Sequence, residues 1–504
     1  MLHGNKSVEC MQNGILLASV DLGSNSFRLE IARHEHGQLQ RTEYLKETVR
    51  LGNGLDAERN LTPEAMQRGW DCLARFGERL AGFRRAQVRA VATQTLREAR
   101  NRDEFLAKAR ELLGFQVDVI PGREEARLIY LGVAHLLPQS DERRLVVDIG
   151  GRSTELILGQ GYEARQMESY RLGSVAWSMK YFANGQFSAE AFDTAEIAAK
   201  ALLDEALGHY SRDSWDVAYG SSGTIGAVAD VLGAAGRPPT AVTREGLDWL
   251  RERLMRAQST DKLRMDGMKD DRRAVIGGGL SVLRAVFDLL NIDTMQAAQG
   301  ALRQGALFDL LDREEEKTDR RGTTVMVLSK KFGMDAVQAA RVAQVATSLL
   351  GQLGSAGPND ARTARKLGWA AQLHEIGCHI SHSEYHKHGA YILDNADAPG
   401  FAVPELHRLS QLVLGHRGKL RKLEADFEDP GFAAQLICLR LAVILCHARR
   451  DPDLKDARLG LAGREFRLGL PAGWSASFPQ SAHLLREEAL AWQKMPWAFQ
   501  AAFA

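Results

Sequence analysis

Two short turns in this 504-residue chain carry the residue types that hold phosphate. SVDLGSNSFRLEIAR (19–33) and VVDIGGRSTELILG (146–159) each read as an apolar strand, a D-x-G-x-x-S turn and a second strand with alternating apolar residues. Glycine lets backbone N–H groups approach phosphate oxygens closely, and Ser and Thr hydroxyls add donors. The acid that ends each first strand, Asp21 or Asp148, can hold Mg²⁺ or its water shell beside a phosphate. The pattern therefore predicts phosphate chemistry.

The two turns follow one template, which strengthens this prediction. Asp21 aligns with Asp148, and Gly23 aligns with Gly150. A single turn of this kind would equally fit a hairpin whose Asp and Ser bond their own backbone. Two matched copies are more typical of two related α/β domains that face each other across a cleft, so that both turns meet at one ligand.

Two further segments are candidates for the same site, and each also has an ordinary structural explanation. YGSSGTIGAVADVLG (219–233) reads as a strand, a Gly/Ser turn and a helix start, which suits an anion but also fits a common βα loop. PGREEARLIYLGV (121–133) places Glu124 and Glu125 in the first turn of a helix, where the helix dipole favours acids. At the floor of a cleft, either glutamate could accept a proton from attacking water. Spacing alone does not choose between them.

Several basic residues and histidines leave their roles open. Arg97 and Arg50 each lie close to a predicted turn, where an arginine can bind phosphate through two donors or remain on the solvated surface. The segment QLHEIGCHISHSEYHKHGAYIL (372–393) contains five histidines and suggests a metal site. A His-Asp site would require Asp after His374, but Glu375 stands there, so we weigh a structural role more heavily.

The elements that must position these residues predict several domains. Strands alternate with helices between the two turns. The strand DVAYG (216–220) is followed, after the Gly/Ser turn, by a helical stretch to about residue 310. The charged run DREEEKTDRRGT (312–323) has no apolar face and marks a boundary. The remaining sequence is mostly helical in pattern.

Composition excludes several functional classes. The formal net charge is +1, so no broad basic field suits DNA. The five cysteines contain no CxxC pair, which supports neither a zinc ribbon nor a disulfide framework and fits a reducing cytoplasm. No apolar run approaches the roughly 18 residues of a membrane span. We therefore expect a cytoplasmic protein without membrane insertion.

The motifs together resemble the exopolyphosphatase / guanosine pentaphosphate phosphatase family (Ppx/GppA) in its long form. The resemblance runs in order over nearly the whole chain. Besides the two turns it rests on ATQTLREA (92–99), REEARLIYLGVAH (123–135), GSSGTI (220–225), GALRQGAL (300–307), LHEIG (373–377) and HGAYILDNADAPGF (388–401).

This resemblance implies a fold and an activity. The fold would be α/β, with two actin-like domains (ribonuclease H-like, of the sugar-kinase, Hsp70 and actin type) around a cleft, followed by mostly α-helical, degenerate HD-like domains. The activity would be Mg²⁺-assisted hydrolysis of the terminal phosphate of inorganic polyphosphate, of the 5′-terminal phosphate of guanosine pentaphosphate (pppGpp), or of both. The resemblance also implies a homodimer. We predict domains at 1–135, 136–311, 324–450 and 451–504.

The resemblance also assigns roles within the site. It selects Glu125 over Glu124 as the catalytic glutamate that activates water, and it places metal-linked acids at Asp148 and Glu155. Asp21 is the corresponding acid of the first turn. The predicted phosphate-binding residues come from both turns, the third turn and one arginine: Gly23, Ser24, Asn25, Ser26, Arg97, Gly150, Gly151, Arg152, Ser153, Thr154, Ser222 and Gly223.

Arg152 departs from the family, which usually has a small residue at that position. Its side chain either leans over the cleft mouth and contacts a phosphate beyond the terminal one, or points to solvent. Its backbone either keeps φ negative or is strained.

We predict an exopolyphosphatase that can also act on pppGpp. A kinase of the same fold and a non-catalytic sensor of these polyanions are the alternatives. The sequence does not decide between polyphosphate and pppGpp, because both present a terminal phosphoanhydride to the same turns.

Overall fold

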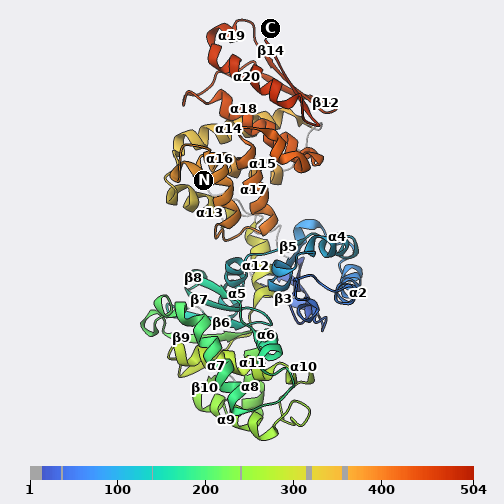
Figure 1. Ribbon diagram of the computed structural model, residues 1–504, viewed down its shortest axis with the longest axis vertical. Coiled ribbons are helices and arrows are strands. Elements are labelled where there is room, and N and C mark those ends of the chain that lie inside the picture. The colour runs from blue at the N-terminus through green and yellow to red at the C-terminus, as the bar shows by residue number, and fades with distance from the viewer. Residues whose placement is uncertain are drawn as a thin grey trace. The chain divides into compact units, whose positions relative to one another are not determined.

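The two copies of the template fold into two sheets (Figure 1). The strands of the two sheets follow a matching order. The computed structural model describes residues 14–35, 38–138, 140–238, 241–313, 320–354 and 361–503. The first sheet, in the order β3-β2-β1-β4-β5, contains β1 (Ile15–Leu22), β2 (Phe27–Glu35), β3 (Gln38–Glu47), β4 (Val88–Ala92) and β5 (Val117–Val119). The second, in the order β10-β11-β9-β6-β7-β8, contains β6 (Arg143–Ile149), β7 (Thr154–Gln160), β8 (Glu163–Tyr170), β9 (Val217–Ser221), β10 (Ala241–Thr243) and β11 (Thr294–Ala297).

Equivalent strands also pair in the same sense. β1 is antiparallel to β2 and parallel to β4, just as β6 is antiparallel to β7 and parallel to β9. β1 and β6 are almost entirely buried, as expected for apolar strands in the centre of a sheet. The duplicated α/β architecture inferred from the two turns is therefore confirmed. We call the part that carries the first sheet subdomain I and the part that carries the second sheet subdomain II.

Two helices join the subdomains. α5 (Gly122–Leu136) packs on β8, α12 (Leu302–Arg313) packs on β1, and the two helices pack against each other. Gly132 and Gly305 make this close approach possible, because a Cβ at either position would overlap a backbone carbonyl of the other helix or of the turn before it. The first turn of α5 is thereby held at the junction of the two sheets.

Part of subdomain II differs from the prediction. The stretch expected to be helical up to about residue 310 contains α8 (Ser222–Ala234), α9 (Arg244–Ala257), α10 (Asp270–Arg273) and α11 (Ile276–Leu289), but also the strands β10 and β11. These two strands have three and four residues. Such short segments show no alternation of their own, and their partners in the sheet make them strands.

The chain divides into two compact units, Met1–Asp319 and Arg320–Ala504. Of the charged run predicted as a boundary, residues 314–319 lie outside the described residues. The second unit contains α13 (Arg320–Lys331), α14 (Ala336–Gln352), α15 (Ala361–Gln372), α16 (Tyr385–Asn395), α17 (Val403–Gly415), α18 (Pro430–Leu445) and α20 (Pro479–Trp492). Its core surrounds α18, most of whose side chains are buried.

The second unit is mostly helical in its described residues, as predicted, but its end also contains a short sheet that the sequence analysis did not identify. β12 (Arg458–Ala462), β13 (Glu465–Leu470) and β14 (Ala498–Phe503) form a three-stranded sheet. The sequence does contain a hairpin signal here. Apolar residues occupy every second position on both sides of the turn at Gly463, which has φ 60°: Leu459 and Leu461 before it, and Phe466 and Leu468 after it. None of the helices in the described residues is both long enough and apolar enough to cross a membrane.

Candidate active site

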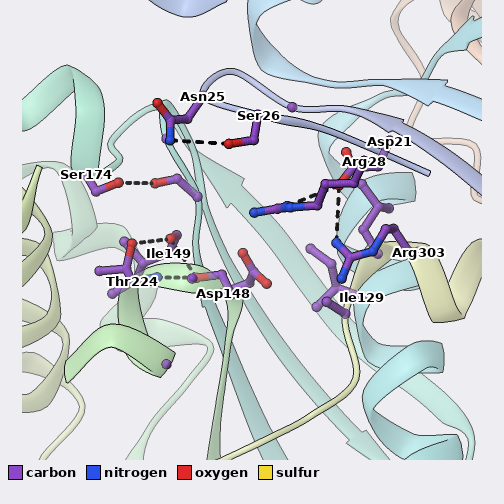
Figure 2. A pocket seen from close by; sticks show the side chains of 18 of the residues that line it. Asp21, Asn25, Ser26, Arg28, Ile129, Asp148, Ile149, Ser174, Thr224 and Arg303 are labelled. Carbon is purple, nitrogen blue, oxygen red and sulfur yellow. Dashed lines mark hydrogen bonds and ion pairs between the residues drawn. The ribbon is translucent and has the colours of Figure 1, made fainter. Parts of the chain in front are cut away.

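Both repeated turns and the start of α8 converge on one cavity of about 450 Å³ in the first unit (Figure 2). Of the predicted site residues, those that line it are Asp21, Gly23, Ser24, Asn25, Ser26, Glu125, Asp148, Gly150, Gly151, Ser153, Ser222 and Gly223. The other four, Arg97, Arg152, Thr154 and Glu155, do not line it. Segments that are far apart in the sequence thus form one site.

The first turn, Gly23–Ser26, connects β1 to β2 and is held from outside. Gly23 leaves room for the turn to close, because a Cβ there would stand 3.0 Å from the carbonyl oxygen of Ser26. The Ser24 hydroxyl accepts a hydrogen bond of 2.8 Å from Thr95 Oγ1. Arg50 is exposed and does not line the cavity; only its backbone N–H takes part, donating to the Asn25 carbonyl over 2.8 Å.

The second turn, Gly150–Ser153, connects β6 to β7 and lies against the first. The N–H of Gly150 donates to the Ser153 carbonyl over 2.9 Å, and a Cβ on Gly151 would stand 3.2 Å from the Cβ of Ser24. Thr154 is fully buried and its hydroxyl donates to the Leu172 carbonyl over 2.8 Å, so it supports the turn from behind.

Backbone strain is found in the third turn. Neither Asn25 nor Arg152 has a positive φ, so the second turn accommodates an arginine without a left-handed residue. Ser222, the first residue of α8, has φ 79°, a conformation that costs a non-glycine residue about 1 kcal/mol. Its hydroxyl donates to the Ile149 carbonyl over 2.7 Å. A ligand at this helix start would therefore meet backbone N–H groups, with the Ser222 hydroxyl already engaged.

The two adjacent glutamates of α5 have different surroundings. The Glu124 carboxylate is bound by both Arg127 Nε (2.8 Å) and Arg127 Nη2 (2.9 Å) within the protein. The Glu125 carboxylate lines the cavity and accepts a hydrogen bond of 2.7 Å from Arg97 Nη1. Burial raises the pKa of the Glu125 carboxyl above its ordinary value, and the charge of Arg97 opposes that shift. The geometry thus separates two residues that spacing could not.

Asp148 and Glu155 face each other across β6 and β7. Burial, together with the charge of Glu125, raises the pKa of Asp148 to about 7. Burial and the charges of Glu125 and Asp148 raise the pKa of Glu155 well above its ordinary value. Like charges this close in a dry site are unfavourable unless a cation or protons compensate them. Asp148 and Glu155 are therefore the residues of this site that could hold a divalent cation.

The family model of the Ppx/GppA phosphatase family matches residues 30–314, and that of Ppx/GppA phosphatase domain III matches residues 320–490. The chain belongs to the Ppx/GppA phosphatase family. The predicted family and the predicted enzyme class, a hydrolase of phosphoanhydride bonds, are therefore confirmed.

Two curated relatives and two solved structures illustrate the similarity. A protein of Photobacterium profundum named guanosine-5′-triphosphate,3′-diphosphate pyrophosphatase is 38% identical over 487 residues, covering 96% of this chain and 97% of the relative. A Vibrio atlanticus protein of the same name is 40% identical over 477 residues, covering 94% of this chain and 95% of the relative. The Aquifex aeolicus Ppx/GppA family member matches with a TM-score of 0.51, 25% identity and coverage of 60% and 99%. An exopolyphosphatase-like protein matches with a TM-score of 0.53 and 26% identity, and the match covers 58% of this chain and 97% of that protein. These structures support the actin-like subdomains.

Sequence reasoning missed the cations of this Ppx/GppA cavity. Arg28, Lys46, Lys269, Arg272 and Arg303 all line it. In Figure 2 the side chains of Arg28 and Arg303 lie beside Asp21, across the cavity from Ser174 and Thr224. Arg272 packs on Gly223, and its guanidinium has one ion-pair partner among the described residues, Asp271 at 3.9 Å. No sequence pattern indicated Arg272, because only folding brings α10 to the turns.

Arg28 could have been found from the internal repeat. It occupies the position in the first turn's strand that Glu155 occupies in the second: Asp21 pairs with Arg28, and Asp148 with Glu155. Arg28 Nη1 lies 3.3 Å from Asp21 Oδ2. The first copy is therefore close to neutral here, whereas the second carries two acids. We therefore expect a metal ion beside Asp148 and Glu155. The predicted metal role fits Asp21 less well, because Arg28 already supplies a positive charge there.

Two histidines of the histidine-rich segment, His374 and His386, are buried in the second unit beside His416, whereas His379 and His382 are exposed. His374 and His416 each bond a backbone carbonyl through Nδ1, at 2.7 and 2.6 Å, and their rings are 5.4 Å apart. Burial lowers the pKa of both imidazoles. Glu375, where a His-Asp site needs Asp, pairs with Arg449 at 2.9 Å. Within the described ranges, no group of three or more His, Cys, Asp or Glu side chains is placed to hold a metal ion.

Proposed function

We propose that this protein hydrolyses the 5′-terminal phosphate of pppGpp, with inorganic polyphosphate as a second substrate. The order of these substrates is the reverse of the one expected from the sequence. The observation that carries the proposal is the cavity itself, where two glycine turns and a helix start meet a buried glutamate. The names of the two relatives favour the guanosine substrate for this chain. Membership in a phosphatase family argues against the kinase alternative.

The proposed reaction is a direct transfer of the phosphoryl group to water. Glu125 accepts the proton of a water molecule whose oxygen forms a bond to the terminal phosphorus. The bond from that phosphorus to its bridging oxygen breaks, and the shortened guanosine polyphosphate leaves. The backbone N–H groups of both turns hold the terminal phosphate in line with the attacking water. No phosphorylated enzyme is required.

We propose Mg²⁺ as the cofactor, held by Asp148 and Glu155. The proposal is supported by the pairing of Asp148 with Glu155 across β6 and β7 and by their burial, which together with neighbouring acids raises the pKa of both carboxyl groups. Two carboxylates suit Mg²⁺, which commonly keeps several waters and phosphate oxygens in its shell. When bound, the ion would supply positive charge to the terminal phosphate and its leaving oxygen.

The cations on the far side of the cavity give the substrate a second anchoring point. Burial lowers the pKa of the Arg272 guanidinium, and the charge of Arg28 lowers it further. Two guanidinium groups that line the same cavity favour an anionic ligand there. Phosphates that are not hydrolysed, either the 3′-diphosphate of pppGpp or the continuing polyphosphate chain, are suitable anions.

A comparison of substrates tests the proposed function. Phosphate release from pppGpp and from long-chain polyphosphate would be measured with Mg²⁺ in one preparation and expressed as kcat/KM. We expect turnover of both, with the larger kcat/KM for pppGpp. Binding without release of phosphate from either compound would instead support the non-catalytic sensor. Release from polyphosphate alone would overturn the assignment of the guanosine substrate.

The second unit also enters the proposal. We propose that its helices are a degenerate HD-type domain and that the protein is a homodimer. The buried, neutral histidines support a structural role for this unit. Light scattering on the full chain would measure its mass, and a mass of one chain at micromolar concentration would contradict the dimer.

A further inference from the structure

Arg152 reaches from subdomain II to subdomain I. Its Nη1 donates to the Gly52 carbonyl over 3.2 Å, and its Nη2 donates to Glu98 Oε2 over 3.1 Å. Gly52 provides the space, because a Cβ there would stand 3.0 Å from Arg152 Cδ. Arg152 and Glu98 side chains are 21% and 17% exposed, so water screens the pair only partly. The guanidinium neither leans into the cavity nor points to solvent.

Glu98 continues the contact along α3 (Gln94–Glu98). Gln94 Nε2 donates to Glu98 Oε1 over 2.6 Å. Gln94 Oε1 accepts from Arg97 Nε and Nη2, at 3.0 and 2.7 Å. Gln94, Arg97 and Glu98 lie on neighbouring positions of one helix face, three and four residues apart, which permits this sequence of bonds.

The series of bonds ends at the proposed catalytic base. Arg97 Nη1 donates to Glu125 Oε2 over 2.7 Å and to the Ile120 carbonyl over 2.8 Å. Arg152, Glu98, Gln94, Arg97 and Glu125 therefore form a continuous hydrogen-bonded path from the subdomain boundary to the cavity. Positive and negative groups alternate along it, with the Gln94 amide in the middle.

We infer that Arg152 is a positioning residue that couples contact between the subdomains to the orientation of Glu125. This inference rests on the proposed function, because it assigns Glu125 the role of base. When the Arg152–Glu98 contact forms, Glu98 fixes the Gln94 amide, the amide oxygen fixes Arg97, and Arg97 holds the carboxylate of Glu125 in one position. When the contact opens, each group gains freedom and the base is less well aligned. Misalignment by about 1 Å can cost on the order of 100-fold in rate.

A direct phosphate contact by Arg152, the expectation from the sequence, makes a different kinetic prediction. A residue that binds the substrate changes KM, whereas a residue that only aligns the base changes kcat. Arg152→Ala and Glu98→Ala would therefore be measured singly and together on pppGpp. We expect kcat to fall about 10-fold in each single variant with KM within about 2-fold of wild type. The kcat of the double variant should be no lower than that of either single variant, because each substitution alone already removes the same Arg152–Glu98 contact.

Three further measurements make the test specific. Arg152→Lys should recover part of kcat, because a lysine can reach Glu98 but not the Gly52 carbonyl at the same time. The acid limb of the kcat–pH profile should move to higher pH in Arg152→Ala, since a loosened Arg97 no longer lowers the pKa of Glu125. Arg244→Ala, which removes an ion pair with Asp288 away from the cavity, is the matched control and should retain wild-type kcat.

The outcomes separate this inference from the proposed function. A wild-type protein that releases no phosphate from pppGpp or polyphosphate would contradict the proposed function itself. With an active wild type, unchanged kcat in Arg152→Ala would overturn the inference. A raised, salt-dependent KM at constant kcat would overturn it as well and would assign Arg152 to the substrate. Additive losses in the double variant would show that Arg152 and Glu98 act separately.

Discussion

Arg97 Nη1 lies 2.7 Å from Glu125 Oε2, within an ion pair whose partners are largely buried. The arginine expected to face phosphate thus binds the expected catalytic glutamate. The pair opposes protonation of a buried carboxylate, because burial raises the pKa of Glu125 and the charge of Arg97 lowers it. It also means that Arg97 influences the chemistry through Glu125, whatever else it contacts when substrate binds.

Glu125→Gln should remove catalysis while preserving binding. The amide keeps the shape of the side chain but cannot accept the proton of water, so we expect kcat to fall by about 10²–10⁴-fold. Phosphate release would be measured by a coupled assay, and pppGpp binding by calorimetry. Circular dichroism would verify the fold. A folded Glu125→Gln protein with full activity would refute the assigned base, and Glu124 could not replace it while bound to Arg127.

Arg97→Gln should shift the pH dependence of kcat. Arg97 lowers the pKa of Glu125, so its removal leaves burial unopposed and raises that pKa further. The base must be ionised to act, and the acid limb of the profile should therefore move to higher pH. Profiles of wild type and variant would be recorded on pppGpp. A loss of kcat that is equal at every pH would contradict control of the base by Arg97.

Asp148 should make the protein less stable as pH rises. Its folded pKa is about 7 against an ordinary value of 3.8, so between those values the folded state binds more protons than the unfolded state. Stability therefore falls as pH increases through this interval. Glu155 acts in the same direction. Thermal unfolding in chelator should give a higher Tm near pH 5 than near pH 8, and Mg²⁺ should recover the loss at pH 8.

Asp148→Asn provides the matched variant for that experiment. It removes the charge, so in chelator at pH 8 we expect Tm to rise by roughly 2–4 °C, the shift that about 1 kcal/mol produces in a domain of a few hundred residues. The gain from Mg²⁺ should shrink and activity should be lost. Asp193→Asn, which does not line the cavity, is the control. An unchanged response to Mg²⁺ in Asp148→Asn would place the ion elsewhere.

Arg272→Ala should weaken substrate binding. Its guanidinium lines the cavity with a single distant partner among the described residues, so it is available for a phosphate. A lost charge-assisted hydrogen bond of about 1.5–3 kcal/mol corresponds to a roughly 10- to 100-fold higher KM for pppGpp. The difference in KM between Arg272→Ala and wild type should become smaller at high salt, because salt screens the charges. Arg273→Ala, one residue further and outside the cavity wall, should keep the wild-type KM.

The local features of this protein could be read from its sequence. The two D-x-G-x-x-S turns are strand ends that lead into glycine and serine, and their chemistry depends on neighbouring residues only. The correspondence of Asp21 with Asp148 was enough to predict two equivalent sheets, because a repeated template folds in the same way twice. β10 and β11 were missed, since three or four residues become a strand only beside a partner.

The arrangement of charges was decided only by the tertiary structure. Glu124 and Glu125 are adjacent and alike in sequence, and the fold directs one to Arg127 and the other to the cavity. Arg152 likewise meets Glu98, and Arg272 meets Gly223, through contacts between distant segments. The direction of a side chain depends on what packs around its helix or turn, and these neighbours are supplied by other parts of the chain. Sequence thus determined which groups this phosphatase possesses, and folding determined which of them face each other.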